Sequence, residues 1–385
     1  TPRPDQYVGV TTFTGNGAGN GNQEVTFPFK PDLVITKQRS GTASSGVYDT
    51  VRGTNSKLYT NSASQANTNN DAGPASWDYR GVTLDDTGDD IVYNGAAGVA
   101  WGWKAGGNPG ITTTGIYIDG VSYASAAAAG LDGGSIDPNA ASIGTKEGFS
   151  ILKYTADLAE VPNSIAHGLT KKPDFAIFKN IESTLGVNEV DWGVYHKSIG
   201  ATKVLELNQN LAMQDYDGPF NDTEPTSSLF YFGGKSGGSI MGHSYTTNGP
   251  AGDDFIGYIW HDVPGLQKFG TYEGDDANGS GPFVDCGFRP SLILIKNVDA
   301  AQDWILIDGT RDPNNVSYRW LKPNSNGAEN TTTTDNCIDI LSNGFIPRGA
   351  NTSNDATNGP SQTIVYAAWA AEPIHNLYGG QSNAR

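Results

Sequence analysis

The sequence contains few of the residues that build metal centres, redox sites and disulfide frameworks. Its 385 residues include two cysteines, two methionines and five histidines. Cys286 and Cys337 allow one disulfide, but two buried thiols are an interpretation at least as good. The histidines are His167, His196, His243, His261 and His375. None of them has an HxH or HExxH spacing, so we expect structural or surface roles and no zinc site.

Positive charge is scarce as well. The chain has 24 lysines and arginines against 41 aspartates and glutamates, which gives a formal charge of −17. A phosphate backbone needs a basic stripe, and the sequence contains no lysine or arginine cluster. Anionic membranes are disfavoured for the same reason, and no apolar run reaches transmembrane length. We therefore expect neither nucleic-acid binding nor membrane insertion.

Glycine and aromatic residues, in contrast, are plentiful. The chain has 50 glycines, and 10% of its residues are aromatic. This share of glycine is typical of turns between short strands, and the aromatic residues supply anchors for several cores. Helical periodicity is nearly absent. The composition predicts an all-β protein, and a chain of this length predicts two or three domains.

A cassette of a basic residue, Pro, Asp or Ser, an apolar run and a final Lys occurs three times. Its copies span residues 30–37, 172–179 and 289–296. Proline at the start of a strand costs no ladder hydrogen bond, and the apolar run suits a buried strand. Each cassette therefore predicts a core strand.

Further signals accompany each cassette in a fixed order. An aromatic strand and a Gly/Asp/Asn loop open each copy, in residues 13–17, 154–157 and 272–275. An aromatic or apolar strand follows the cassette, in residues 46–49, 191–196 and 303–308. A Leu-x-x-Asn element comes next, at Leu58 and Asn61, Leu205 and Asn208, and Leu321 and Asn324. A closing strand ends on Trp, in residues 99–103, 255–260 and 364–369. These ordered matches establish an internal repeat.

Each copy has the length and the strand rhythm of an antiparallel, jelly-roll-like β-sandwich. We expect three tandem sandwiches that are independent domains on a string. The predicted domains are residues 1–104, 148–264 and 265–378, with an insert at 105–147 and a tail at 379–385. Within the insert, Asp119-Gly120 between alternating apolar residues predicts a type I′ hairpin over residues 116–123, and residues 124–129 suggest one or two helical turns. The insert is interpreted as a spacer, or alternatively as an arm that packs on a neighbouring subunit.

The pattern resembles a domain of unknown function found in tail-fibre and other virion proteins of marine tailed phages, especially cyanophages. Besides the cassettes and closing Trp strands, the matching stretches are residues 1–7, 101–107, 221–228, 269–272, 281–284 and 341–345. The resemblance implies concanavalin-like or laminin-G-like sandwiches in structural or adhesive proteins. It implies no catalytic residues. Asp-Leu-Ala-Glu at 157–160 departs from the pattern, which has a Gly-Asn loop there in the second repeat.

Signals for enzyme chemistry are weak. Residues 234–238 formally match the GxSxG nucleophile elbow, but that elbow leads from a strand into a helix and no helical pattern follows here. A glycosidase needs two carboxylates at a set separation, and with 41 acidic residues the sequence cannot test for such a pair. We therefore expect no catalytic residue and no cofactor, and a polysaccharide depolymerase is the enzyme alternative.

Two kinds of binding site remain as hypotheses. Asp-rich loops at residues 85–90, 253–254 and 275–280 offer the oxygen ligands that calcium prefers, but without EF-hand spacing, so a metal site stays open. Sugar binding employs exposed aromatic faces. The candidate aromatic residues are Trp77, Tyr79, Trp192, Trp304 and Trp320. Trp192 and Trp304 occupy equivalent places in two repeats, which favours the core for both. Trp101 and Trp103 share one strand face, which again indicates packing.

We interpret the chain as a non-enzymatic structural protein of a phage virion, either a tail fibre or a fibre-like appendage that contributes to host attachment. It would lie at the surface of the extracellular particle. Its expected partners are other virion proteins, a host surface glycan bound as a receptor, and further copies of the chain in a homotrimer. The alternatives are a capsid decoration or tail-assembly spacer without a host ligand, and the depolymerase.

Overall fold

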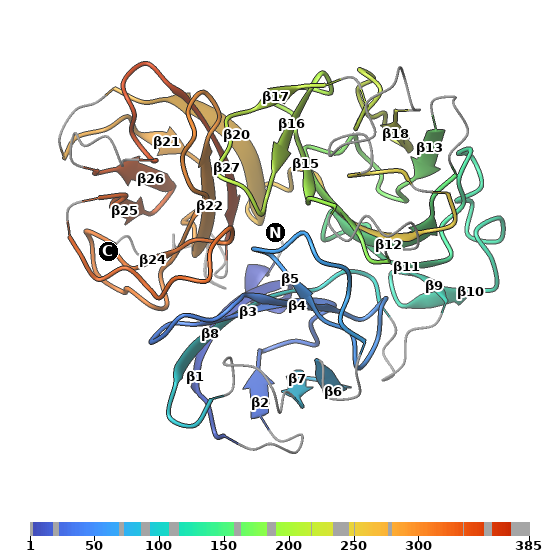
Figure 1. The fold of residues 1–385 in the computed structure, drawn as a ribbon, viewed down its shortest axis with the longest axis horizontal. Coiled ribbons are helices and arrows are strands. Elements are labelled where there is room, and N and C mark those ends of the chain that lie inside the picture. Colours follow the sequence, from blue (N-terminus) through green and yellow to red (C-terminus); the bar gives the residue numbers. More distant parts are fainter. Residues whose placement is uncertain are drawn as a thin grey trace.

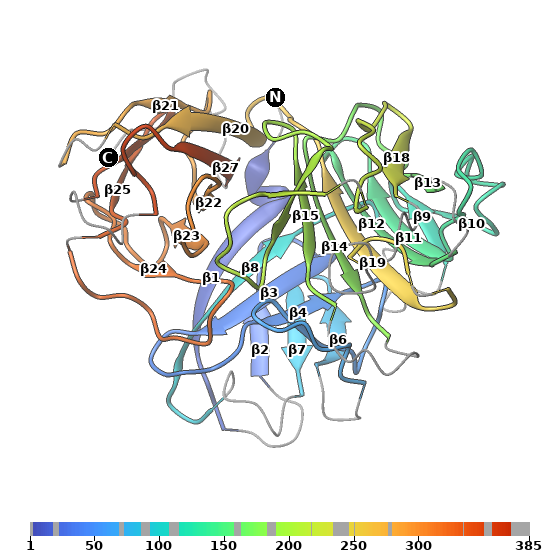
Figure 2. The same ribbon diagram turned by 45° about the horizontal axis from the view of Figure 1, so that its top comes forward.

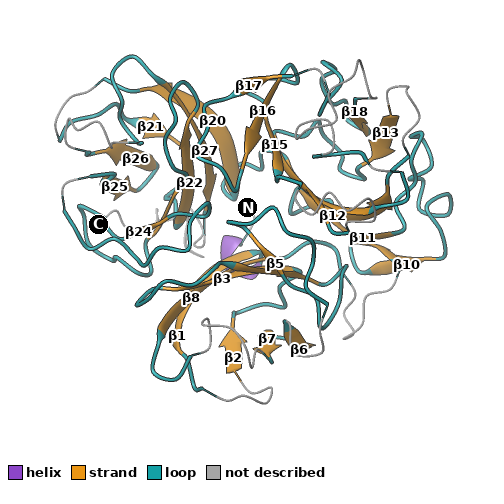
Figure 3. Cartoon of the chain, in the orientation of Figure 1, coloured by secondary structure: helices purple, strands orange, loops and turns teal. Residues whose placement is uncertain are grey.

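The computed structural model describes thirteen stretches of the chain. These are residues 3–17, 23–68, 73–85, 93–107, 115–157, 163–182, 190–216, 218–233, 246–249, 251–275, 279–333, 335–349 and 356–370. Within them the regular elements are β-strands and one three-residue 3-10 helix, η1 (Pro4–Gln6). The predicted all-β class is confirmed (Figure 3). In these stretches no helix has the length and apolar character needed to cross a membrane.

Three large sheets share one strand order. The first contains β1 (Val8–Thr14), β8 (Ala97–Trp103), β3 (Leu33–Gln38), β4 (Gly46–Asp49) and β5 (Leu58–Tyr59). The second contains β12 (Phe149–Thr155), β19 (Asp254–Trp260), β14 (Phe175–Asn180), β15 (Gly193–His196) and β16 (Lys203–Glu206). The third contains β20 (Gln267–Glu273), β27 (Thr363–Trp369), β22 (Leu292–Asn297), β23 (Ile305–Asp308) and β24 (Trp320–Leu321). In each sheet the closing Trp strand lies between the opening strand and the cassette strand. We call residues 8–103, 149–260 and 267–369 units 1, 2 and 3.

A smaller antiparallel sheet accompanies each large one. The small sheets are formed by β2 (Gln23–Thr26), β7 (Gly81–Leu84) and β6 (Pro74–Asp78), by β13 (Asn163–Ala166) and β18 (Leu229–Phe232), and by β21 (Val284–Asp285), β26 (Gly344–Pro347) and β25 (Ile338–Leu341). In unit 1 an apolar cluster connects the two layers, with Val25, Trp77 and Val82 of the small sheet packing with Val34 and Tyr48 of the large one. Each unit therefore buries apolar residues between two layers of strands. The predicted domain boundaries stay predictions.

The hairpin in the insert forms as predicted. Strands β9 (Ile116–Ile118) and β10 (Val121–Tyr123) pair across Asp119 and Gly120, whose φ angles of 50° and 82° match a type I′ turn. Residues 124–129 form turns and no helix. Strand β11 (Ala140–Gly144) pairs with β9 in parallel and with β12 antiparallel, and β17 (Gln214–Asp215) adds the opposite edge. The interpretation of the insert as a spacer is wrong, because its backbone extends the unit 2 sheet to nine strands.

The three units share one core around a common axis. The large sheets face one another there (Figures 1 and 2), and one apolar cluster contains residues from all three. The closing tryptophans Trp103, Trp260 and Trp369 form a triangle with ring centroids 5.5–6.5 Å apart, each pair edge to face. The expectation of independent domains on a string is therefore wrong. The repeat predicted the sheets but not that each sheet has two apolar faces, one of which is buried against the other units.

The final lysine of each cassette joins neighbouring units. Its Nζ donates to a backbone carbonyl of the next unit, and these bonds run from Lys37 to Ser325, from Lys179 to Ala63 and from Lys296 to Asn210, over 3.3, 2.8 and 3.4 Å. A backbone hydrogen bond repeats at each junction, from Ala66 to Ile181, from Met213 to Val298 and from Glu329 to Arg39, over 3.1, 2.8 and 3.0 Å. Burial lowers the pKa of Lys179 to about 7. The lysine recurs because each junction needs a donor at this place.

A second junction contact lies nearer the tryptophan triangle. The residue at the end of the second strand is Asp49 in unit 1, His196 in unit 2 and Asp308 in unit 3. Asp308 accepts a hydrogen bond from Trp101 Nε1 of unit 1 over 3.0 Å, and Asp49 accepts one from the Tyr258 hydroxyl of unit 2 over 2.7 Å. His196 closes the third junction, with Nε2 3.2 Å from the Tyr366 carbonyl oxygen.

His196 should make the protein sensitive to acid. Its Nδ1 accepts a hydrogen bond from the Ser198 N–H over 3.2 Å, so the folded structure holds the neutral ring, and burial lowers its pKa to about 4. His167 is held in the same manner and its pKa is also lowered to about 4. The unfolded chain, with an ordinary histidine pKa of about 6.5, takes up protons between pH 6.5 and 4 that the folded chain does not.

We therefore expect the free energy of unfolding to fall as the pH drops from about 6.5 to 4, by about 3 kcal/mol for each histidine. Urea denaturation at a series of pH values measures this slope. The variant His196→Gln keeps polar groups at the site but removes the titration, so its slope should be shallower. Equal slopes for the two proteins would contradict the assignment to His196.

Candidate functional site

A surface groove lies where unit 1 meets the β9–β10 hairpin. Its volume is about 530 Å³. Residues from η1 and the segment after it, from the loops that follow β2 and β6, and from the segment after Trp103 form one part of its wall. The hairpin turn and residues 146–147 form the other part. The groove therefore depends on the insert joining unit 2 and packing beside unit 1.

Aromatic rings stand at this groove. Strands β6 and β7 pair through Asp78 and Gly81, which leaves Tyr79 at the tip of a two-residue turn, where it is 73% exposed. Tyr7 follows η1, and Lys104 Nζ lies 5.7 Å from the centroid of its ring. An exposed ring beside hydrogen-bonding groups is the usual means by which a protein binds the face of a sugar.

Three lysines line the groove although the chain as a whole is strongly acidic. They are Lys30, Lys104 and Lys146. Lys146 is exposed, whereas Lys30 is half-buried and burial lowers its pKa. The groove thus offers ammonium donors beside an exposed aromatic ring.

Two buried carboxyl groups complete the wall. Asp32 accepts hydrogen bonds from the Thr50 hydroxyl and the Ala105 N–H over 2.9 and 2.8 Å, and burial raises its pKa. Glu147 is 8% exposed and burial raises its pKa too. Within the described residues Glu147 Oε2 has no hydrogen-bond partner. The residue opposite is Gly144, where a Cβ would lie 2.6 Å from this oxygen, so glycine leaves room for the carboxyl group. An unpartnered buried carboxyl oxygen is a hydrogen-bond acceptor available to a ligand.

The predicted sugar-binding aromatic residues separate into core and surface. Trp77, Trp192 and Trp304 are buried to within 2% and belong to apolar clusters. The preference for the core at Trp192 and Trp304 is confirmed, as is the packing of Trp101 and Trp103. Trp320 is partly buried, and its Nε1 donates to the Asp335 carbonyl over 3.0 Å. Tyr79 is the candidate that stands exposed at the groove.

The other predicted sites come out as follows. Asp253 accepts a hydrogen bond from Asn180 Nδ2 over 2.9 Å, and Asp254 pairs with Lys153 over 2.6 Å, so both carboxylates have protein partners. Across the described stretches no three His, Cys, Asp or Glu side chains gather in a way that could hold a metal ion. Several candidates lie outside the described residues, namely residues 86–90, 234–238 and 276–278, His243, His375 and the tail at 379–385.

The two cysteines and the remaining histidine are buried. No disulfide joins Cys286 and Cys337, and burial raises the pKa of the Cys286 thiol to about 12. His261 is 3% exposed, and burial lowers its pKa. The interpretation of the cysteines as buried thiols is confirmed.

Sequence reasoning missed most of the groove. Tyr7 and Lys104 belong to stretches that carry the family resemblance, but nothing in the sequence placed these stretches side by side. Glu147 sits at the end of the predicted insert, and its burial follows from the packing of β11 against unit 1. The missing information was therefore tertiary.

The comparisons with known proteins identify a family. Residues 3–132 and 116–373 match the model of a domain of unknown function, DUF7483, in two overlapping regions that together cover nearly the whole chain. Neither the curated proteins nor the solved structures give a match. The chain belongs to the DUF7483 family, a domain of unknown function.

Proposed function

We propose that this protein is a non-enzymatic structural and attachment protein of a phage virion, of the tail-fibre kind, and that its groove binds a glycan of the host surface. The proposal rests on Tyr79, an exposed ring held beside lysine donors and the acceptor oxygen of Glu147. Ring stacking together with a few well-placed polar groups is the chemistry that recognises carbohydrates.

The architecture supports the structural part of the proposal. We further propose that the three units are copies of one β-sandwich module, of the concanavalin-like or laminin-G-like kind. The matching registers of the three cassette strands on their closing Trp strands support this. Their shared core makes a single compact body from modules that otherwise would move independently, which suits an appendage that must present a surface at a fixed orientation. Assembly of the chain as a trimer belongs to the same proposal.

Replacing Tyr79 by alanine should weaken glycan binding about tenfold, since an aromatic contact contributes on the order of 1 kcal/mol beyond its buried area. The measurement is binding of the purified chain to envelope polysaccharides of candidate host bacteria, by glycan array and then by titration calorimetry. The matched control is Tyr93→Ala, because Tyr93 is 66% exposed and does not line the groove. Equal losses in the two variants, or none in either, would contradict the groove as the binding site.

Glu147 supports a second candidate function, the polysaccharide depolymerase. A carboxyl group with a raised pKa in a groove can act as a general acid toward a glycosidic oxygen. Release of reducing ends from a bound polysaccharide, lost in Glu147→Gln, would replace the attachment proposal with this one. Absence of glycan binding, together with density on the capsid or between tail proteins in electron cryomicroscopy of the particle, would favour the decoration or spacer role.

A further inference from the structure

One position breaks the equivalence of the three units. It precedes the second strand of each large sheet and is Ser45 in unit 1, Trp192 in unit 2 and Trp304 in unit 3. The backbone N–H at each of these positions donates to the asparagine of the Leu-x-x-Asn element, namely Asn61, Asn208 and Asn324, over 3.3, 2.9 and 3.1 Å. The three backbones therefore correspond, and the side chain alone differs.

In units 2 and 3 the indole at this position crosses a junction. Trp192 Nε1 donates to the Tyr59 carbonyl of unit 1 over 3.0 Å, and Trp304 Nε1 donates to the Glu206 carbonyl of unit 2 over 2.9 Å. The two accepting carbonyls are equivalent, since each belongs to the residue after the leucine of the Leu-x-x-Asn element. Both rings are almost fully buried. Each indole therefore fills a slot between two units and satisfies one carbonyl.

At the third junction the slot has no indole. The equivalent carbonyl is that of Lys322, which among the described residues accepts a hydrogen bond from the Ser325 N–H. The carbonyls of Tyr59 and Glu206 accept the corresponding turn bond as well as the indole bond. Carbonyl oxygens have two lone pairs, so the Lys322 carbonyl retains one acceptor site for a further donor.

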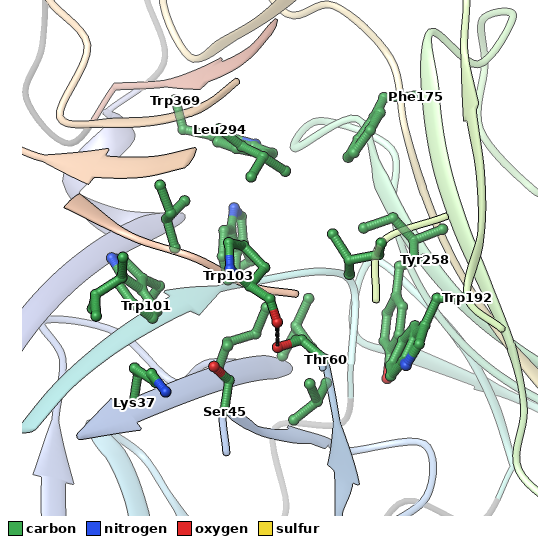
Figure 4. Close-up of a pocket in the computed structure, with 18 of the residues that line it drawn as sticks. Lys37, Ser45, Thr60, Trp101, Trp103, Phe175, Trp192, Tyr258, Leu294 and Trp369 are labelled. Carbon is green, nitrogen blue, oxygen red and sulfur yellow. Dashed lines mark hydrogen bonds between the residues drawn. The ribbon is translucent and has the colours of Figure 1, made fainter. Parts of the chain in front are cut away.

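A cavity lies where the third indole would be. Ser45, Val47 and Thr60 of unit 1 and Leu306, Leu321 and Lys322 of unit 3 are among the residues that line it. Figure 4 shows Ser45 and Thr60 below Trp103 and Leu294 around this space. The Thr60 hydroxyl is engaged by the Pro323 carbonyl over 2.6 Å.

The cavity is large enough for an aromatic ring system. The volume open to the centre of a water molecule is about 60 Å³. Adding one water radius around that volume gives on the order of 200 Å³, more than the roughly 150 Å³ of an apolar cavity that binds benzene. Its walls are mostly apolar, including Trp101, Trp192 and Tyr258. Such a space excludes charged ligands and favours a flat apolar one.

We propose that this cavity is a binding site for a small planar aromatic molecule with one N–H donor, of the indole class. The ring occupies the place of the missing side chain between units 1 and 3, and its N–H donates to the Lys322 carbonyl. Trp192 and Trp304 show, at the two equivalent junctions, how such a ring fits and which atom it contacts. This site is separate from the surface groove and does not depend on what that groove binds.

Titration calorimetry of the whole chain with indole, 1-methylindole and buffer alone tests the proposal. Indole should bind with one site per chain, and 1-methylindole, which lacks the N–H, should bind at least about tenfold more weakly because the carbonyl is left unpaired. Absence of indole binding up to its solubility limit, or equal affinity for the two ligands, would overturn the proposal.

Ser45→Trp supplies the ring from the chain itself. We expect this variant to lose indole binding and to unfold at a higher temperature than the parent protein, because the new side chain fills the cavity. Ser44→Trp is the matched control, since it places the same side chain one residue earlier on a partly exposed position and should keep indole binding. If Ser45→Trp does not fold, Ser45→Phe supplies a smaller ring for the same comparison. Unchanged indole binding in a folded Ser45 variant would contradict the site.

Discussion

Replacing Trp260 by alanine is expected to lower the free energy of unfolding by about 3–5 kcal/mol and to destabilise all three units together. Trp260 stacks on Phe149 with centroids 4.4 Å apart and also contacts Trp103 of unit 1 and Trp369 of unit 3. Its removal leaves a cavity at the point where the three sheets meet. Because each sheet covers part of this cavity, the loss is shared by all units.

Hydrogen exchange and chemical denaturation separate this outcome from the alternative. In Trp260→Ala the core amides of β3, β14 and β22 should all exchange faster, and unfolding should remain a single transition. Trp77→Ala is the matched control, because Trp77 is equally buried but lies in the core of unit 1 alone. Its faster exchange should be strongest in β2, β6 and β7. A Trp260→Ala protein in which unit 2 alone unfolds would contradict the shared core.

The second large effect is expected at Asp308. Its carboxylate accepts hydrogen bonds from Arg311 Nε over 2.5 Å and from Trp101 Nε1 of unit 1 over 3.0 Å. Both members of the ion pair have fully buried side chains. Asp308→Ala leaves the Arg311 guanidinium with Glu329 as its remaining carboxylate partner, and it leaves the Trp101 N–H without an acceptor. Breaking a buried pair by removing one member costs about 3–5 kcal/mol, and we expect this loss of stability here.

Thermal and urea unfolding of Asp308→Ala measure the loss, with Asp215→Ala as the control. Asp215 pairs with Lys203 at the surface, and its side chain is 77% exposed, so its removal should cost only about 0–1 kcal/mol. Raising the salt concentration should reduce the small Asp215 effect further and leave the Asp308 effect nearly unchanged, since buried pairs are poorly screened. Similar losses for both variants would show that the buried junction contributes no more than a surface pair.

The repeat could be found from the sequence because its signals are local. Proline before an apolar run, Asp-Gly at a hairpin turn and alternation along the closing strands each follow from backbone chemistry over a few residues. The structure confirms the hairpin at Asp119 and Gly120 and places Trp192 and Trp304 in the core. The cassette lysines were visible as a pattern, but their role was not, because the carbonyls they bind belong to another unit.

The candidate site was only partly predictable for a similar reason. Tyr79 was a candidate because a tyrosine near a turn is often exposed. The partners that make it part of a groove come from η1, from the segment after Trp103 and from the insert, three stretches far apart in the sequence. Burial of Glu147 depends on the same packing, so its raised pKa could not be inferred before the structure.

The sequence by itself determined the strand content, the threefold repetition and the absence of a basic surface, because composition and local pattern act through short-range backbone preferences and net charge. Tertiary structure decided that three repeats close around one axis, because the apolar second face of each large sheet has to be buried against something. That closure brings Trp103, Trp260 and Trp369 together, buries the junction lysines and leaves a vacant slot beside Ser45. Long-range burial of this kind depends on how whole sheets fit together, which no local pattern specifies.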